Sequence, residues 1–238
     1  MVLNLIYLNN STFLVPQTIT KYYNNLAKDY DNNRFANTYG KYIHTQEDKI
    51  LQYYLKENNT KFNLDIACGT GRFLKYADFG ADISSEMIKI SQNKYPDKTL
   101  KVAKAECLPF NNMQFENITC FHLMMHLNNR TLSTILTEAH RVLKPVGRFI
   151  FDVPSEKRRK LTKYKSSSWH GGHQISVKEL KRIINNKWHL ETYYGIAFLP
   201  IHRIPKSLRK RFVKLDNSLS KSILKEYSSH LLFILTKK

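Results

Sequence analysis

Short apolar runs alternate along the chain with segments in which apolar residues recur every three or four positions. Runs of four to eight apolar residues are typical of buried strands, and the longer recurrence is typical of helices. Seven strands are predicted at or near 62–67, 81–83, 100–103, 118–122, 148–153, 192–198 and 231–235, where 81–83 is the end of the second strand. Helical periodicity separates several of them, as at 84–95 and 132–143. This alternation predicts an α/β fold, with a doubly wound, mostly parallel seven-stranded Rossmann-like sheet and helices on both faces.

Helix starts can also be predicted from the sequence. Apolar residues at helical spacing over 18–57 predict helices ahead of the sheet, with Thr18 as the first N-cap. Ser84 is the predicted N-cap of a later helix, and Ser176 has capping-box spacing to Glu179. We find no internal repeat and no linker in the sequence, so we expect one domain over 1–238.

The segment from Leu64 to Gly71 is the most informative stretch. It predicts a buried strand that enters a glycine turn and then a helix, which is how α/β folds present backbone N–H groups to a nucleotide-like ligand. Gly69 and Gly71 allow a sharp turn and a close approach of backbone to ligand. Asp82 follows eleven positions later, at the end of the second predicted strand. We expect its carboxylate to accept hydrogen bonds from ribose hydroxyls.

Composition narrows the protein class. The chain has 238 residues, 42 % of them hydrophobic, and no apolar run approaches the roughly 20 residues that cross a bilayer. The first residues lack the basic region of a signal peptide. Three cysteines form no C-x-x-C pair, which indicates neither a disulfide framework nor a zinc site. We therefore expect a cytoplasmic protein.

The chain is strongly basic. Lys and Arg number 38 against 19 Asp and Glu, a net charge of +19 with a pI near 9.8. One interpretation is a polyanionic partner: RNA, a phosphate-bearing substrate or an anionic membrane face. The other is compositional bias, since Asn, Lys, Ile and Tyr are the residues that an AT-rich genome favours.

Several motifs occur in an order that resembles a known family. Asp65–Gly71 resembles its glycine turn, and Gly80–Met87 resembles G-x-D-x-S-x-x-M. Ala105–Phe110 is similar to A-x-x-L-P-F, Glu138–Pro145 to E-x-x-R-V-L-K-P, and Tyr30 with the next residue to an N-terminal Y-D. The order resembles class I S-adenosylmethionine-dependent methyltransferases, within them the type 11 group related to quinone-biosynthesis methyltransferases.

The resemblance implies a cofactor site for S-adenosylmethionine. It divides the chain into an N-terminal helical lid at 18–57, a cofactor-binding core at 62–153 and acceptor-side elements at 154–238. Ala67 replaces a common glycine, Lys104 stands where many members carry aspartate, and only ten residues separate Gly71 from Asp82, so the first helix should be truncated. The implied cofactor-binding residues are Tyr30, Asp65, Ala67, Cys68, Gly69, Gly71, Asp82, Ile83, Met87, Ala105, Glu106 and Phe121.

Two histidines after the fourth predicted strand are candidate catalytic residues. Methyl transfer to a hydroxyl or ring carbon needs a general base, and His122 and His126 are the nearest candidates in this fold. The structural alternatives are that His126 packs the strand–helix junction and that His122 lines the cofactor pocket.

The later histidines and basic residues are candidates for binding the methyl acceptor. His170 and His173 form H-x-x-H, but a second pair of ligands is not evident, so we expect no metal site there and a contact with substrate instead. His202 and Arg203 are further candidates. Basic clusters at 157–165 and 203–214 follow two predicted strands, and the carboxyl ends of parallel strands are where ligands bind. Their placement favours an anionic acceptor.

The sequence thus predicts a cytoplasmic S-adenosylmethionine-dependent methyltransferase. The expected acceptor is an anionic or phosphate-linked small molecule, sugar or lipid-linked compound. One alternative is a tRNA or RNA methyltransferase, whose binding would weaken steeply with salt. A second alternative is a non-catalytic cofactor-binding protein that uses a basic face to contact a partner or, peripherally, a membrane.

Overall fold

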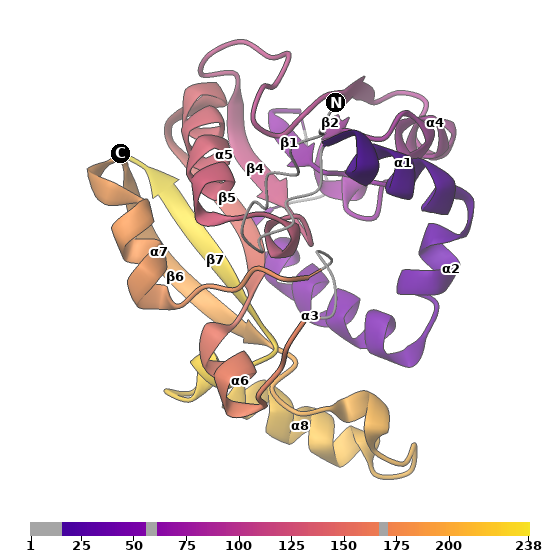
Figure 1. The fold of residues 1–238 in the computed structure, drawn as a ribbon, viewed down its shortest axis with the longest axis vertical. Coiled ribbons are helices and arrows are strands. Elements are labelled where there is room, and N and C mark those ends of the chain that lie inside the picture. Colours follow the sequence, from indigo (N-terminus) through magenta and orange to yellow (C-terminus); the bar gives the residue numbers. More distant parts are fainter. Residues whose placement is uncertain (1–15, 56–60, 167–170) are drawn as a thin grey trace, which may run out of the picture.

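The computed structural model describes residues 16–55, 61–166 and 171–238. In these ranges seven strands form one sheet in the order β3-β2-β1-β4-β5-β7-β6 (Figure 1). Neighbours from β3 through β5 are parallel, and β7 is antiparallel to both β5 and β6. The predicted α/β fold is therefore confirmed. The strands are β1 (Asn63–Ile66), β2 (Phe79–Asp82), β3 (Thr99–Val102), β4 (Phe115–Cys120), β5 (Leu143–Pro154), β6 (Trp188–Ile196) and β7 (His230–Lys237).

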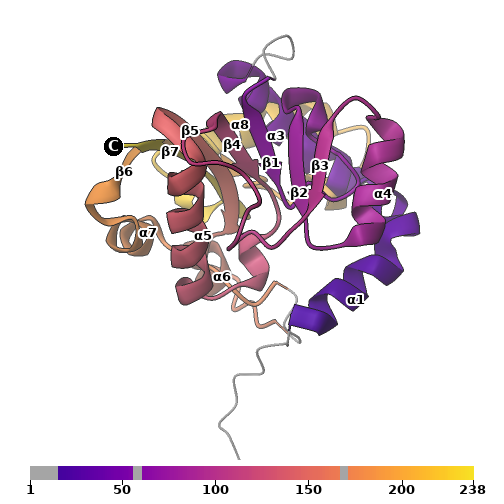
Figure 2. The same ribbon diagram turned by 90° about the horizontal axis from the view of Figure 1, so that it is seen from above.

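Helices cover both faces of the sheet, with α5 on one and α3 on the other (Figure 2). Side chains alternate along a strand, so β5 sends Phe149 and Phe151 into the apolar cluster with α5 and Ile150 into the cluster with α3. Burial on both faces explains the continuous apolar runs Phe149–Phe151 in β5 and Leu231–Leu235 in β7. The helices are α1 (Pro16–Leu26), α2 (Tyr30–Arg34), α3 (Thr38–Tyr54), α4 (Ser85–Lys94), α5 (Asn129–Val142), α6 (Glu156–Leu161), α7 (Val177–Ile183) and α8 (Arg209–Leu219). None in the described ranges is long and apolar enough to cross a membrane.

Two of the three predicted helix caps are confirmed. The Ser84 hydroxyl accepts a hydrogen bond from the Met87 N–H at 3.1 Å, and the Ser176 hydroxyl accepts one from the Glu179 N–H at 3.3 Å. The prediction for Thr18 is wrong because α1 begins at Pro16. Proline suits a first helical position, since its φ is already helical and its missing N–H would have no partner there.

The connection from β1 to β2 is short, as the ten-residue spacing predicts. It contains one 3₁₀ turn, Leu74–Tyr76, in place of a full helix. The middle of α3 packs beside this connection: Arg72 pairs with Glu47 at 2.7 Å, and the Tyr76 hydroxyl donates to Asp48 at 3.0 Å. The first crossover therefore places Arg72 and α3 close to the end of β1.

The first two helices are held over the carboxyl end of β1 and β2. The Ser84 hydroxyl donates to the Asn24 side chain at 2.6 Å, which ties α1 to the start of α4. In α2, Asp31 accepts a hydrogen bond from the Thr70 hydroxyl and pairs with Lys94, both at 2.5 Å. Thr70 lies in the glycine turn, so α1 and α2 sit directly beside the predicted cofactor site.

Candidate active site

The turn after β1 has the backbone conformation that its glycines predict. Gly69 and Gly71 have φ of 54° and 91°, and Ala67 has φ of 55°, all in the left-handed region that favours glycine. A Cβ added at Gly69 would meet no atom within 4 Å, whereas one at Gly71 would reach Tyr95 at 3.0 Å. The space in front of Gly69 is therefore open, and the turn presents its backbone to a pocket.

Asp82 lies at the end of β2 beside this turn. Its two oxygens accept backbone hydrogen bonds from the N–H groups of Gly69 at 2.9 Å and Ser84 at 2.8 Å. Burial raises the pKa of Asp82, although these backbone bonds act to lower it. The carboxylate is fixed by the main chain while one side of it faces the pocket.

The pocket beyond Asp82 fits a nucleoside. One end is polar, with Asp82 and the open backbone at Gly69, and the walls further along are mostly apolar. Vicinal hydroxyls suit the carboxylate, and a flat base suits the apolar walls. Nine of the twelve expected cofactor residues line it: Tyr30, Ala67, Gly69, Asp82, Ile83, Met87, Ala105, Glu106 and Phe121. Further lining residues, not expected from the sequence, include Ile19, Ala103, Leu123, Leu127 and Ile135.

A smaller recess continues from the turn and contains two more of the expected residues, Asp65 and Cys68. Asp65 accepts a hydrogen bond from the Thr119 hydroxyl at 2.6 Å. Burial raises the pKa of Asp65 from 3.8 to about 7, with Thr119 and Arg72 acting in the opposite direction. The last expected residue, Gly71, lies outside the lining and shapes the turn through its N–H, which donates to Cys68 O at 2.9 Å.

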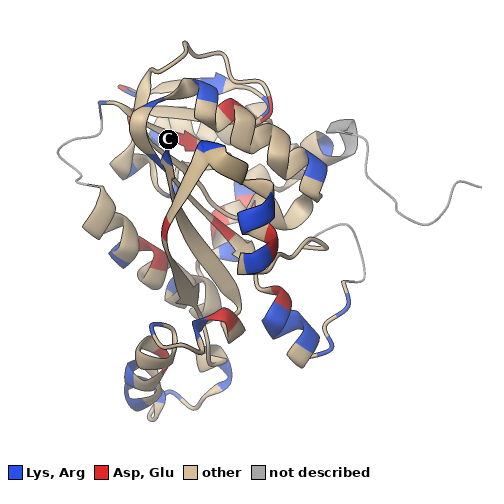
Figure 3. Ribbon diagram, turned by 90° about the vertical axis from the view of Figure 1, so that its left-hand side faces the viewer, with Lys and Arg blue, Asp and Glu red and all other residues tan. Residues whose placement is uncertain are grey.

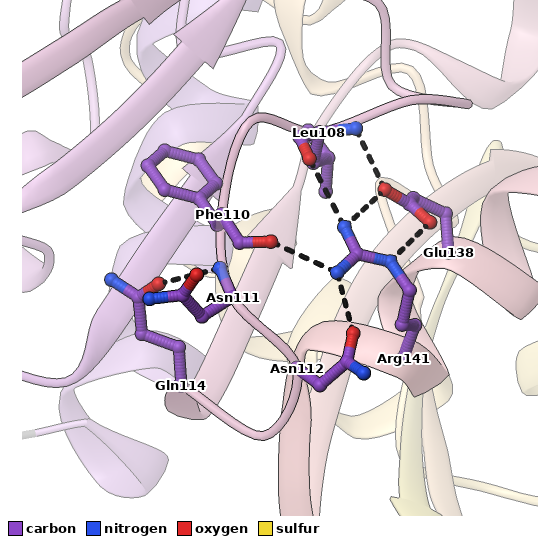
Figure 4. A network of polar contacts seen from close by, with 7 residues as sticks. All are labelled: Leu108, Phe110, Asn111, Asn112, Gln114, Glu138 and Arg141. Carbon is purple, nitrogen blue, oxygen red and sulfur yellow. Dashed lines mark hydrogen bonds and ion pairs between the residues drawn. The ribbon is translucent and has the colours of Figure 1, made fainter.

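The loop that carries Ala105 and Glu106 is held in place from α5 (Figure 4). Arg141 pairs with Glu138 at 2.7 Å and donates to the carbonyl oxygens of Leu108 at 3.0 Å and Phe110 at 2.9 Å. The Glu138 carboxylate also accepts a hydrogen bond from the Leu108 N–H at 2.7 Å. The E-x-x-R motif is thus a structural clamp on one wall of the cofactor pocket and makes no direct contribution to its lining.

A second pocket adjoins the first and shares Tyr23, Tyr30, His122 and His126 with it. Its other lining residues come from α2, α3, the turn before α5 and the start of β7: Asn33, Arg34, Phe35, Asn37, Tyr39, Gly40, Ile43, Met125 and His230. The shared wall is where a group in one pocket would meet a group in the other. Both candidate catalytic histidines therefore lie at this boundary.

His126 is held from two sides. Its Nδ1 accepts a hydrogen bond from the Gly171 N–H at 3.1 Å, so the neutral ring carries its proton on Nε2. Nε2 then donates to the Tyr23 hydroxyl oxygen at 3.0 Å. Because the Tyr23 oxygen accepts this hydrogen bond, its own hydrogen can be donated to another group at the wall that the two pockets share.

His122 lies among ionisable groups. Its Nε2 is 3.1 Å from Glu47, and its Nδ1 is 3.7 Å from Asp152. Burial acts to lower the pKa of His122, but Asp152 and Glu47 outweigh burial and raise it. Arg72 and His122 in turn outweigh burial at Glu47 and lower its pKa to about 2. Spacing along the sequence could not reveal this group, because its members come from α3, from the segment after β4 and from β5. The catalytic roles of His122 and His126 stay predictions.

None of the described acceptor-binding candidates lines the second pocket. His173 uses both ring nitrogens on neighbours, at 2.9 Å from the Met124 carbonyl oxygen and 2.9 Å from the Asn129 side chain. His202 packs on Tyr39, with ring centroids 4.6 Å apart, and touches the pocket only through it. Arg203 is exposed, and His170 lies outside the described residues. Their roles toward substrate stay predictions.

Neither basic cluster lines the second pocket. They lie on and around α6 and α8, at one end of the molecule (Figure 3). From α6, Arg158 donates to the Tyr227 carbonyl oxygen at 3.5 Å and Arg159 to that of His173 at 3.0 Å. From α8, Arg209 donates to the backbone carbonyls of Ile204 and His202, so it braces a turn. No residue of either cluster is among the described lining residues.

Comparison with known proteins agrees with this geometry. Residues 64–151 match a family model described as a methyltransferase domain. An uncharacterized protein of Methanocaldococcus jannaschii is 44 % identical over 138 residues, covering 57 % of this chain and 51 % of its own. A demethylmenaquinone methyltransferase of Symbiobacterium thermophilum is 29 % identical, covering 56 % of this chain and 58 % of its own.

Among solved structures, the fold resembles that of a protein from Thermotoga maritima described as an S-adenosylmethionine-dependent methyltransferase, possible histamine N-methyltransferase. The TM-score is 0.68 at 17 % identity, covering 92 % of this chain and all of that one. The matched segment spans only about half the length of the two curated relatives.

Proposed function

We propose that this chain is a class I S-adenosylmethionine-dependent methyltransferase of the type 11 group, whose family model residues 64–151 match, and that it methylates an anionic or phosphate-linked acceptor. The acceptor class covers small molecules, sugars and lipid-linked compounds. One observation carries the proposal: the second pocket contains the Arg34 guanidinium and His122, whose pKa is raised by Asp152 and Glu47, and no carboxylate is among its described lining residues. Such a wall favours a negatively charged group.

The residues at the shared wall suit direct transfer between two bound molecules. Bound at the turn and Asp82, S-adenosylmethionine would supply a sulfonium methyl group for the acceptor's lone pair, and the sulfur would keep the electron pair of the broken carbon–sulfur bond. Tyr23, Tyr30, His122 and His126 belong to both pockets, so they can align the two partners and exclude water between them. An anionic acceptor oxygen needs no base, since it carries no proton to lose.

We assign Tyr23 a direct role toward the acceptor and His126 a positioning role. Because the Gly171 N–H fixes the tautomer of His126, the His126 Nε2–H orients the Tyr23 hydroxyl. Burial raises the pKa of Tyr23 far above its usual range, so the hydroxyl stays protonated and can donate to an anion.

The experiment that tests the function is a methyl-transfer screen with labelled cofactor. Cell extract is separated into small-molecule, lipid and RNA fractions, and both label transfer and S-adenosylhomocysteine formation are measured. The proposal expects label in the small-molecule or lipid fraction, with one S-adenosylhomocysteine per transferred methyl. Label in RNA would support the tRNA alternative, and no turnover in any fraction would contradict an active enzyme.

Replacing Tyr23 with phenylalanine should lower kcat about 10- to 100-fold, because small losses of alignment are costly in an in-line transfer. The ring is retained, so the Kd for cofactor should change little. Tyr53→Phe is the matched control, since Tyr53 is 79 % exposed on α3. Steady-state kinetics with the identified acceptor would contradict the assignment if Tyr23→Phe and Tyr53→Phe gave the same kcat.

Replacing Arg34 with glutamine should raise the KM for the acceptor about tenfold or more, since hydrogen bonds to charged groups contribute about 1.5–3 kcal/mol. The KM for cofactor should stay the same. Lys41→Gln provides the control, because Lys41 is exposed on α3 and outside the pocket lining. An unchanged acceptor KM in Arg34→Gln would show that this guanidinium does not bind the acceptor.

A further inference from the structure

A group of buried ionisable side chains lies at the wall of the second pocket, in which we propose that the acceptor binds. His122 follows β4, Asp152 lies in the last part of β5, and His230 begins β7. These strands are neighbours in the sheet, and Pro154 pairs with His230 in the β5–β7 register. Since β7 runs antiparallel to β5, its first residue reaches the same edge of the sheet as the ends of β4 and β5. The topology thus brings together three side chains from distant parts of the sequence.

The atoms of this group are buried and without hydrogen-bond partners among the described residues. They are His122 Nε2, Asp152 Oδ2, His230 Nδ1 and, from α3, Glu47 Oε1. Glu47 and His122 approach to 3.1 Å without the alignment of a hydrogen bond. One unpaired buried polar atom costs about 1–3 kcal/mol. Ion pairs with His122, at 3.1 Å and 3.7 Å, offset this cost for Glu47 and Asp152, whereas His230 Nδ1 has no such partner among the described residues and calls for an explanation.

The two carboxylates are oriented by their other oxygens. Asp152 Oδ1 accepts a hydrogen bond from the His122 backbone N–H at 2.6 Å, which leaves Oδ2 toward the group. Glu47 Oε2 pairs with Arg72 at 2.7 Å, which leaves Oε1 toward His122. Outer contacts of this kind fix the ligands of metal sites.

We propose that His122, Asp152 and His230 bind one divalent transition-metal ion as three protein ligands, with the Glu47 carboxylate beside the site. Two imidazoles and a carboxylate are a ligand set that zinc accepts. One potential ligand atom from each of the three residues lies within 4.8 Å of the other two. Bonds of about 2.0–2.2 Å around a tetrahedral ion separate ligand atoms by about 3.4 Å, so modest side-chain rotations complete the site.

The ion would face the acceptor. His122 and His230 both line the second pocket, so an open coordination position would take an anionic oxygen there. This role rests on the proposed function, whereas the binding of the ion does not. In the competing, metal-free state a protonated His122 offsets the negative charges of Glu47 and Asp152. That state gives the buried Nδ1 of His230 no partner among the described residues.

The experiment uses the full chain, treated with chelator and dialysed, and needs no acceptor. Titration calorimetry with zinc chloride should give one ion per chain, and elemental analysis after desalting should give the same stoichiometry. Cobalt(II) should produce the visible absorption of a four-coordinate site. His230→Gln should weaken the Kd for zinc about tenfold or more, while His189→Gln, at an exposed position of β6, should leave it unchanged.

Either of two results would overturn the proposal. The first is a wild-type chain that retains no ion after desalting and gives no cobalt spectrum, which would support the protonated His122 state. The second is a His230→Gln variant that binds zinc as tightly as the wild type does, which would place the ion elsewhere. If His230→Gln fails to fold, the wild-type stoichiometry and cobalt spectrum still decide. None of these results depends on whether methyl transfer is observed.

Discussion

Replacing Asp82 with alanine is expected to weaken the binding of S-adenosylmethionine about 10- to 100-fold. The carboxylate is buried beside the glycine turn and is held by the N–H groups of Gly69 and Ser84. Ribose hydroxyls that donate to this charged group would contribute about 1.5–3 kcal/mol, and alanine removes the whole contribution. Titration calorimetry of each variant with the cofactor gives the Kd directly.

Two further variants separate ribose binding from other effects. Asp97→Ala removes a carboxylate that is exposed after α4 and should leave the Kd unchanged. Asp82→Asn keeps an oxygen that can accept one backbone hydrogen bond, so it should retain the turn and lose part of the affinity. A Kd in Asp82→Ala equal to that of the wild type would contradict the assignment of this residue to the ribose.

Replacing Asp65 with asparagine is expected to stabilise the chain at pH 8 relative to the wild type, and to have little effect at pH 4. Burial raises the pKa of Asp65 to about 7, against 3.8 for an ordinary aspartate. The folded state therefore holds more protons than the unfolded state between these values, and stability falls as pH rises through this window. A shift of this size corresponds to a difference on the order of 4 kcal/mol.

The measurement is chemical denaturation of the cofactor-free chain at several pH values. The difference in unfolding free energy between Asp65→Asn and the wild type should grow from pH 4 to pH 7 and then level off. Asparagine keeps an oxygen for the Thr119 hydroxyl, so the hydrogen bond at 2.6 Å is not the variable. A difference that stays constant across this range would show that Asp65 is ionised in the folded state at an ordinary pKa.

The cofactor-binding half of the site could be predicted from the sequence because its residues lie close together along the chain. A strand, a glycine turn and the acid at the end of the next strand follow each other within twenty residues, and each reports a local backbone requirement. Even the truncated first crossover followed from the spacing between Gly71 and Asp82. Thr18 was assigned wrongly because Pro16, two residues earlier, is an equally good helix start.

The arrangement of the second pocket could not be predicted from the sequence, because its contacts join segments that are far apart along the chain. Tyr23 forms a hydrogen bond with His126, which lies 103 positions later in the sequence. Glu47 of α3 pairs with His122, which follows β4. The H-x-x-H spacing indicated His173 as a contact with substrate. In the structure both of its ring nitrogens contact residues in or beside the turn before α5.

The position of a basic cluster after a strand does not by itself predict that its side chains reach a ligand. The rule that ligands bind beyond the carboxyl ends of parallel strands predicted both clusters at the pocket mouth. In the structure Arg158, Arg159 and Arg209 all donate to backbone carbonyl oxygens, and none of the three lines the second pocket. A charge pattern predicts only which segments are basic, and packing decides which of those charges reach a ligand.

The most direct test of the account is a crystal structure of the chain grown or soaked with S-adenosylhomocysteine. We expect density for the nucleoside between Asp82 and residues 103–106, with the amino-acid portion against the turn at Gly69 and the sulfur toward the wall of Tyr23 and His126. Density at another place, or a pocket at Asp82 filled by the chain's own side chains at saturating ligand, would contradict it.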